Sequence, residues 1–273
     1  RPDADADSGA TTVGDAHPID RMLPDRFPRT TAAVARKTLL RARRAPFTVQ
    51  YAIVPFFFVF FYAVQGLLES GTLPGWLPLG VAVASAITTG AAFSLNPIGS
   101  EGDALPITLT AGFDGREFVA GLFAAGWLVG VPIGVALPLV TGLATGAAPP
   151  TILATVAIGV GLSIGAPGIA AGAGVHFPNF ETQSVHGGRE TVVPKGWAFG
   201  LFGLGVVGLG APAWALQIRF VRNWLATTAG LAPGTVEFLG IAVGSLLVTV
   251  AGWLGYRHAA GTLDSYWLPG DQF

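Results

Sequence analysis

Few residues in this chain have types and spacings that could support catalysis. Gly161, Ser163 and Gly165 form a Gly-x-Ser-x-Gly pattern, which carries the nucleophile of serine hydrolases, and His176 follows it. That motif needs a strand-turn-helix context or a helical Ser/His dyad, and chance matches are frequent in a chain with 39 glycines. We interpret the pattern as helix packing and expect no catalytic residue, and an intramembrane Ser/His hydrolase stays open as an alternative.

Cofactor and metal motifs are also missing from the sequence. The absence of cysteine excludes disulfides and thiolate metal ligands. His176, His186 and His258 lack metal-ligand spacing, so no metal and no cofactor are predicted. Neither Lys37 nor Lys195 lies in a Gly-x-x-x-x-Gly-Lys-Ser/Thr loop, so the chain cannot cradle ATP in that way. We predict that the chain is not itself an enzyme, and the net charge of −1 gives no reason to expect a nucleic-acid partner.

The composition is typical of a membrane protein. Half of the residues are hydrophobic (51%) and only 11% are charged, whereas a soluble domain has about 25% charged residues. Six apolar stretches reach the roughly 20 residues that a membrane-spanning helix needs. They cover residues 47–68, 76–95, 118–143, 151–175, 197–218 and 238–256. We therefore predict an all-α, polytopic bundle of six transmembrane helices in a lipid bilayer.

Proline and glycine predict local irregularities in these spans. Pro132 and Pro138 in the third span and Pro212 in the fifth predict kinks. The fourth span contains Pro167, and a break near residues 165–168 stays open. Four-residue spacing of glycine lets helix backbones approach closely, which indicates helix packing or dimerisation. The glycines concerned are Gly126, Gly130, Gly134, Gly240 and Gly244.

Positive charge lies almost wholly on one side of the predicted spans. Thirteen of the fifteen lysines and arginines precede the first span, lie in segments 96–117 and 176–196, or follow the last span. The other side has only Arg219 and Arg222. The positive-inside rule then places both termini in the cytoplasm, consistent with an even number of spans in the plasma membrane.

The region before the first span divides into two parts. Residues 1–29 are polar and Pro-rich and are expected to form a flexible tail or linker, leaving 30–273 as the membrane domain. Residues 30–44 contain good helix formers, with Ala35, Leu39 and Ala42 on one face. They form either an interfacial helix at the membrane surface or a basic flank that orients the first span. Their cations are Arg36, Lys37, Arg41, Arg43 and Arg44.

Segment 96–117 is expected to hold a short cytoplasmic helix between two membrane helices. Ser100 and Asp103 have the spacing of a capping box, and Asp114 with Glu117 gives a second helix start at the third span. We expect the carboxylates of Glu101 and Asp103 to be exposed, and an ordinary solvated loop is the alternative. Segment 219–237 is amphipathic and is expected to lie on or dip into the outer leaflet.

Ionisable groups are almost absent from the interior of the spans. The carboxylates Glu69 and Glu237 and the polar amides Gln65 and Gln217 all lie at or near span ends. Carriers driven by protons or sodium ions usually need an intramembrane carboxylate or histidine, so this absence argues against a secondary transporter.

The arrangement resembles the membrane subunit of type-2 ABC transporters, the exporter-like permeases. The likeness covers residues 30–258 and includes the loop from Asn-Pro-Ile-Gly-Ser-Glu-Gly at 96–102 to Gly-Arg-Glu-Phe at 115–118. Segment 176–196 resembles the second cytoplasmic loop of that family, and 219–237 sits where these permeases place an outer re-entrant element. The resemblance implies that a separate ABC ATPase subunit docks on the first loop at Glu101, Gly102, Asp103 and Leu105.

The resemblance also implies a mechanism. Closure of the ATPase pair pushes the loops, and two six-span units repack and move the substrate outward. The two units are either a homodimer or this chain with a second six-span half, as in a doubled archaeal permease. We expect Glu101→Lys to uncouple export while leaving folding intact. A structural or anchoring membrane protein that recruits partners through the basic segment is the further alternative.

Overall fold

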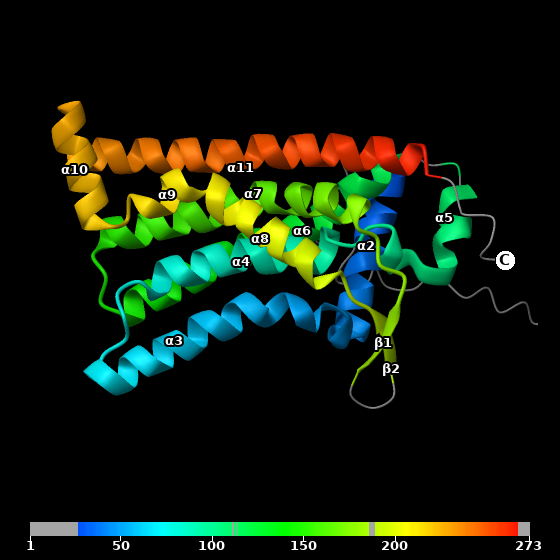
Figure 1. Ribbon diagram of the computed structural model, residues 1–273, viewed down its shortest axis with the longest axis horizontal. Coiled ribbons are helices and arrows are strands. Elements are labelled where there is room, and N and C mark those ends of the chain that lie inside the picture. The colour runs from blue at the N-terminus through cyan, green and yellow to red at the C-terminus, as the bar shows by residue number, and fades with distance from the viewer. Residues whose placement is uncertain (1–26, 111, 113, 186–188, 267–273) are drawn as a thin grey trace, which may run out of the picture.

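The chain folds into an elongated bundle of helices (Figure 1). The computed structural model describes residues 27–110, 112, 114–185 and 189–266. Within these residues five helical segments are long and apolar enough to cross a membrane, so the protein is a helical multi-pass membrane protein. These are Gln50–Ser70, which includes α3 (Val54–Ser70), and helices α4 (Leu77–Ser94), α6 (Gly115–Ala144), α7 (Pro149–His176) and α11 (Pro233–Asp264).

Helix α7 is the centre of the bundle. It packs against α4, α6 and α11, whereas α3 packs against α4 and the 3-10 helix η1 (Pro46–Ile53) that precedes it. In Figure 1 these long helices run along the same axis, and α3 lies at the edge opposite α11. Most of the α3 side chains are exposed, including those of Phe57, Phe58, Phe60 and Phe61.

Glycines allow α7 and α11 to touch backbone to backbone. A Cβ atom on Gly165 would overlap the carbonyl oxygen of Val248, and one on Gly168 would overlap that of Gly252. A Cβ atom on Gly255 would overlap the carbonyl oxygen of Gly168 in turn. Small residues permit such close approach in membrane helices. This pairing was not among the glycine contacts expected from the sequence.

Helix α7 is continuous, so the break considered near residues 165–168 does not occur. Pro167 lies inside the helix, and a Cβ atom on Gly126 of α6 would approach its Cγ to 2.9 Å. Glycine at position 126 therefore makes room for the proline ring. Helix α6 likewise remains helical through Pro132 and Pro138.

The fifth apolar stretch is split into two helices. Helix α8 covers Gly196–Leu209 and α9 covers Ala211–Ala215, with the interruption at Gly210. Pro212 explains the interruption because it has no N–H to continue the hydrogen-bond ladder, so the kink predicted there is confirmed. With 14 residues, α8 is about 21 Å long and shorter than the hydrocarbon core. The predicted fifth span, 197–218, is thus two helices, and α8 is not among the helices long enough to cross a membrane alone.

The two ends of the bundle carry different structures. One end holds α2 (Arg29–Arg44), η2 (Gly99–Ala104), α5 (Leu105–Thr110) and the antiparallel hairpin of β1 (Thr182–Val185) and β2 (Arg189–Val192). The other end holds α10 (Arg219–Ala229) and the short turns between the long helices (Figure 1). The hairpin is a departure from the purely helical fold expected.

Helix α2 confirms the helix predicted over 30–44, and in Figure 1 it runs across the end of the bundle. It buries Thr31, Val34 and Ala35, a face one turn earlier than expected. Gly121 of α6 makes this contact possible, because a Cβ atom there would lie 2.5 Å from the Cβ of Val34. The basic helix is therefore packed on the bundle through one face.

The helix start at the third span is confirmed. The Asp114 side chain accepts a hydrogen bond from the backbone N–H of Arg116 at 2.8 Å, which caps α6. The capping box expected at Ser100 is wrong, because η2 begins at Gly99 and the Ser100 hydroxyl donates to the carbonyl of Pro97 instead. The Asp103 side chain lies outside the described part of the structure.

Candidate functional site

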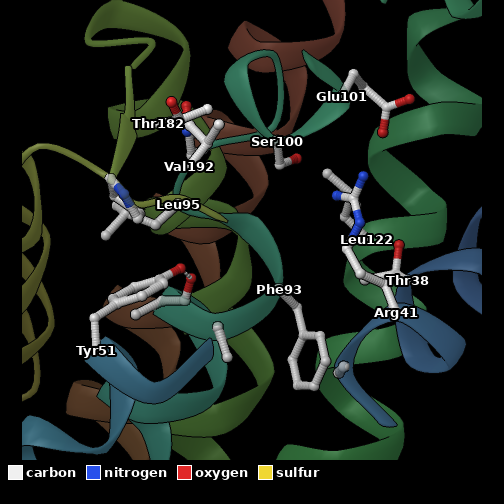
Figure 2. Close-up of a pocket in the computed structure, with 15 residues that line it drawn as sticks. Thr38, Arg41, Tyr51, Phe93, Leu95, Ser100, Glu101, Leu122, Thr182 and Val192 are labelled. Carbon is white, nitrogen blue, oxygen red and sulfur yellow. Dashed lines mark hydrogen bonds between the residues drawn. The ribbon is translucent and has the colours of Figure 1, made fainter. Parts of the chain in front are cut away.

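A cavity of about 230 Å³ lies at the α2 end of the bundle, between α2, the end of α4, η2 and the hairpin. Figure 2 shows Arg41 and Glu101 on one wall and Tyr51, Thr182 and Val192 on the opposite wall. The Tyr51 hydroxyl donates to the carbonyl of Ala91 at 2.8 Å, which fixes η1 against α4. The cavity thus lies where the two loops of this end meet the basic helix.

Asn96 and Asn179 join the first loop to the second. The Asn96 side chain donates to the Asn179 carbonyl at 2.9 Å and accepts from the Asn179 backbone N–H at 3.2 Å. The Asn179 side chain donates in turn to the carbonyl of Val193 at the base of the hairpin, at 2.7 Å. Both asparagines are buried, and Gly99 fits beside them because a Cβ there would overlap the Asn179 carbonyl oxygen.

Glu101 joins the first loop to α2. Its carboxylate forms an ion pair with the ammonium group of Lys37 and accepts a hydrogen bond from the Thr108 hydroxyl at 2.7 Å. The Glu101 side chain is only 4% exposed, whereas that of Lys37 is 43% exposed. The expectation of an exposed Glu101 carboxylate was wrong, because the basic helix folds over the loop and neutralises it.

Arg41 supplies a second positive charge to the cavity. Its guanidinium lies on the same wall as the Glu101 carboxylate (Figure 2), and Thr38 lies beside it. The structure describes no ion-pair partner for Arg41. The remaining cations of α2, Arg29, Arg36, Arg43 and Arg44, are exposed. Lys37 is the α2 cation that pairs with the buried Glu101 carboxylate.

The loop residues beyond Glu101 position α5. Gly102 has φ 52° and ψ −133°, a conformation that strongly favours glycine, and the chain turns there from η2 into α5. Leu105 is 3% exposed and packs in a core cluster with Phe118 and Val119. Among the α5 side chains that the structure describes, Ile107 is an exposed apolar one, at 73% exposure. Leu105 therefore anchors α5 to the bundle.

The hydrolase alternative does not fit this geometry. Ser163 lies in the continuous helix α7, fully buried, and its hydroxyl has no hydrogen-bond partner among the described residues. His176 lies thirteen residues further along the same helix, which corresponds to about 20 Å. Its ring stacks on that of His258, with centroids 4.6 Å apart, rather than on a serine. The Gly-x-Ser-x-Gly residues pack α7 instead, since a Cβ on Gly161 would overlap the Ser245 hydroxyl of α11.

The glycines singled out from the sequence lie at contacts within the chain. Cβ atoms on Gly126, Gly130 and Gly134 in α6 would overlap Pro167 of α7, Thr89 of α4 and Gly159 of α7, respectively. Cβ atoms on Gly240 and Gly244 in α11 would overlap Leu216 and Ala213. The glycines in question are Gly126, Gly130, Gly134, Gly240 and Gly244. They serve helix packing inside one chain.

No protein-family model, curated protein or solved structure matches this chain. The fold and the loop cluster define a multi-pass helical membrane protein with one polar, cross-linked end.

Proposed function

We propose that this chain is the membrane-spanning permease subunit of an ATP-driven exporter of the type-2 ABC class. In this proposal α8 and α9 together complete a sixth crossing of the plasma membrane. Both termini and the α2 end of the bundle then face the cytoplasm. The element order supports it: a basic helix across one end, two loops at that end, and an amphipathic helix, α10, at the other. The asymmetry of thirteen cations against two supports the orientation.

The observation that carries the proposal is the cross-linking of the two loops. The Asn96–Asn179 hydrogen bonds join the first loop to the second, and the Lys37–Glu101 ion pair joins the first loop to α2. A force on α5 would therefore reach α4 through η2. It would reach α7 and α8 through Asn179, and it would reach α6 through α2. Such a connected face suits a subunit driven by an external motor.

The docking residue in this proposal is Ile107. The first loop still receives the ATPase, with Gly102 setting the direction of α5 and Leu105 anchoring it. Glu101 holds this loop against α2 through its ion pair with Lys37. The side chain of Asp103 lies outside the described residues. In this proposal the exposed Ile107 side chain enters an apolar hollow on the ATPase.

The revised role of Glu101 changes the expected phenotype of Glu101→Lys. That variant would place a second ammonium group beside Lys37 in a buried position, which is strongly destabilising. A loss of ATPase binding in this variant could therefore reflect either misfolding or loss of the docking contact. Substitution of an exposed residue distinguishes the two.

Ile107→Asp is that experiment. A tagged full-length chain is purified from its native membranes in mild detergent, and ATP hydrolysis and any bound chain with a phosphate-binding loop are measured. We expect the native chain to retain an ATPase and Ile107→Asp to lose most of it. Gly261→Asp is the control and should retain it, because Gly261 lies at an exposed position near the end of α11 where a Cβ meets open space. An unaltered ATPase complex in Ile107→Asp would remove α5 as the docking element.

A native chain that binds no ATPase would contradict the exporter proposal itself. Partners recovered through the basic residues of α2 alone would then favour the anchoring protein. Arg44→Gln, which changes an exposed α2 cation, separates these outcomes, because it should leave an ATPase bound to α5 in place.

A further inference from the structure

A second cavity of about 320 Å³ lies on the outer surface of the bundle between α6 and α11, with α7 as its floor and Phe27, just before α2, also in its lining. Its volume falls within the range of small-molecule sites. Four aromatic side chains of α6 and α11 dominate the lining: Phe123, Trp127, Trp253 and Tyr256. The backbone glycine contacts between α7 and α11 hold this floor in place.

The aromatic rings are held in position by the protein itself. Phe123 packs edge to face against both Trp127 and Tyr256, with ring centroids 5.6 and 5.4 Å apart. The indole N–H of Trp127 donates to the carbonyl of Ile164 at 2.7 Å. Because that N–H is satisfied within the bundle, the exposed part of the Trp127 ring offers only apolar surface.

The distance from the arginines to the far end of this aromatic groove corresponds to part of the length of an acyl chain. Trp127 lies eleven residues after Arg116 in α6, which corresponds to about 17 Å along the helix. Thr249, also in the lining, lies eight residues before Arg257 in α11, which corresponds to about 12 Å. The groove therefore runs from the membrane interior towards the end of the bundle that carries α2.

Two arginines stand at that end of the groove. The Tyr256 hydroxyl donates to the backbone carbonyl of Arg116 at 3.1 Å, and the Arg257 guanidinium lies 4.9 Å from the ring centroid of Trp253. Both arginines are exposed, and neither forms an ion pair with any residue that the structure describes. The groove thus joins an apolar channel to two available positive charges.

We propose that this groove binds one anionic phospholipid of the surrounding bilayer. An acyl chain lies against Trp127 and Trp253, and the phosphate lies between the guanidinium groups of Arg116 and Arg257. A zwitterionic lipid offers the same chain and lacks the net charge, so the site distinguishes lipids by headgroup. This inference depends on the membrane setting alone and not on ATP-driven export.

Fluorescence quenching by brominated lipid tests the proposal. The full chain is reconstituted in vesicles of phosphatidylglycerol and phosphatidylcholine in equal amounts, with bromine on the chains of one lipid at a time. The bilayer composition is then constant and only the position of the quencher changes. The double variant Trp127→Phe/Trp253→Phe defines the share of the signal that comes from the groove.

We expect brominated phosphatidylglycerol to quench the groove tryptophans more strongly than brominated phosphatidylcholine. Each arginine should contribute about a fivefold preference for the anionic lipid. Arg116→Gln and Arg257→Gln should each reduce the preference, and the double variant should abolish it. Arg219→Gln, an exposed cation at the opposite end of the bundle, is the matched control and should change nothing. Added inorganic phosphate should not compete, because the acyl chain is part of the ligand.

Three results would overturn the proposal. Equal quenching by both lipids would show that the groove contacts only bulk hydrocarbon. A preference that survives the double arginine variant would place the anionic site elsewhere. Groove tryptophans that neither lipid quenches would show that protein covers them, either a second copy or the chain's own residues 1–26. Unchanged melting temperatures of the arginine variants in detergent establish that they fold.

Discussion

The ion pair between Lys37 and Glu101 joins residues 64 positions apart, and its two members differ greatly in exposure. The carboxylate is buried beneath α2, while the lysine side chain is nearly half exposed. The ammonium group can therefore reach solvent if its partner is lost, whereas the carboxylate cannot. Two substitutions that break the same contact should consequently have unequal effects.

We expect Lys37→Met to destabilise the protein more than Glu101→Gln does. Lys37→Met leaves a buried negative charge for which Thr108 is the remaining hydrogen-bond donor among the described side chains, a loss of ~3 kcal/mol. Glu101→Gln leaves a lysine that extends into solvent and costs ~1 kcal/mol. Melting temperatures in one detergent give the order, and the double variant should recover much of the loss. Equal melting temperatures for the two single variants would contradict a buried Glu101.

Asn96→Leu should disconnect the two loops. The substitution leaves the buried Asn179 N–H and carbonyl without their partners, at a cost of ~1–3 kcal/mol for each. Hydrogen exchange should rise in the backbone around residues 177–182 and 193–195. Asn223→Leu in α10, at the opposite end, is the control. Unchanged exchange at Asn179 would mean that the asparagine pair does not hold the loops together.

Gly102→Ala should displace α5. An alanine at φ 52° and ψ −133° is strained by ~1–3 kcal/mol, so the loop relaxes by changing the direction of the helix that follows. Labelling of a cysteine introduced at Ile107 reports the change in exposure. The same cysteine in a Gly196→Ala background is the comparison, because a Cβ on Gly196 meets open space. Identical labelling rates in the two backgrounds would argue against a special conformation at Gly102.

Gly165→Ala should separate α7 from α11. The added methyl group overlaps the Val248 carbonyl oxygen, and neither backbone can move without disturbing the neighbouring glycine contacts. We expect a loss of ~1–3 kcal/mol, seen as a lower melting temperature. Gly200→Ala in α8 meets nothing within 4 Å and should be neutral or raise the melting temperature through helix propensity. A Gly165→Ala protein as stable as Gly200→Ala would mean that these helices are further apart.

Much of this fold could be predicted from the sequence because the bilayer dictates it. Apolar stretches of sufficient length predict the helices at 76–95, 118–143 and 151–175, and the Asp114 cap marks where α6 begins. The split between α8 and α9 was only partly foreseen, since Pro212 marks a kink without giving its extent.

The polar cluster could not be predicted in the same way. Lys37 and Glu101 pair across the bundle end, and no periodicity links positions that far apart in the chain. The Asn96–Asn179 contact is equally non-local, although each asparagine lies next to a proline at the start of a loop. The charge of Glu101 predicted an exposed side chain. It is buried because α2 packs over the loop, and this packing cannot be predicted from the residue type.

The proposed function is tested most directly by determining on which side of the membrane α5 lies. The native chain has no cysteine, so Ile107→Cys and Thr72→Cys each give a single label at opposite ends of the bundle. With a membrane-impermeant maleimide on intact cells, we predict labelling of Thr72→Cys and protection of Ile107→Cys until the cells are opened. Labelling of Ile107→Cys on intact cells would place α5 away from cytoplasmic ATPases and contradict the proposed function.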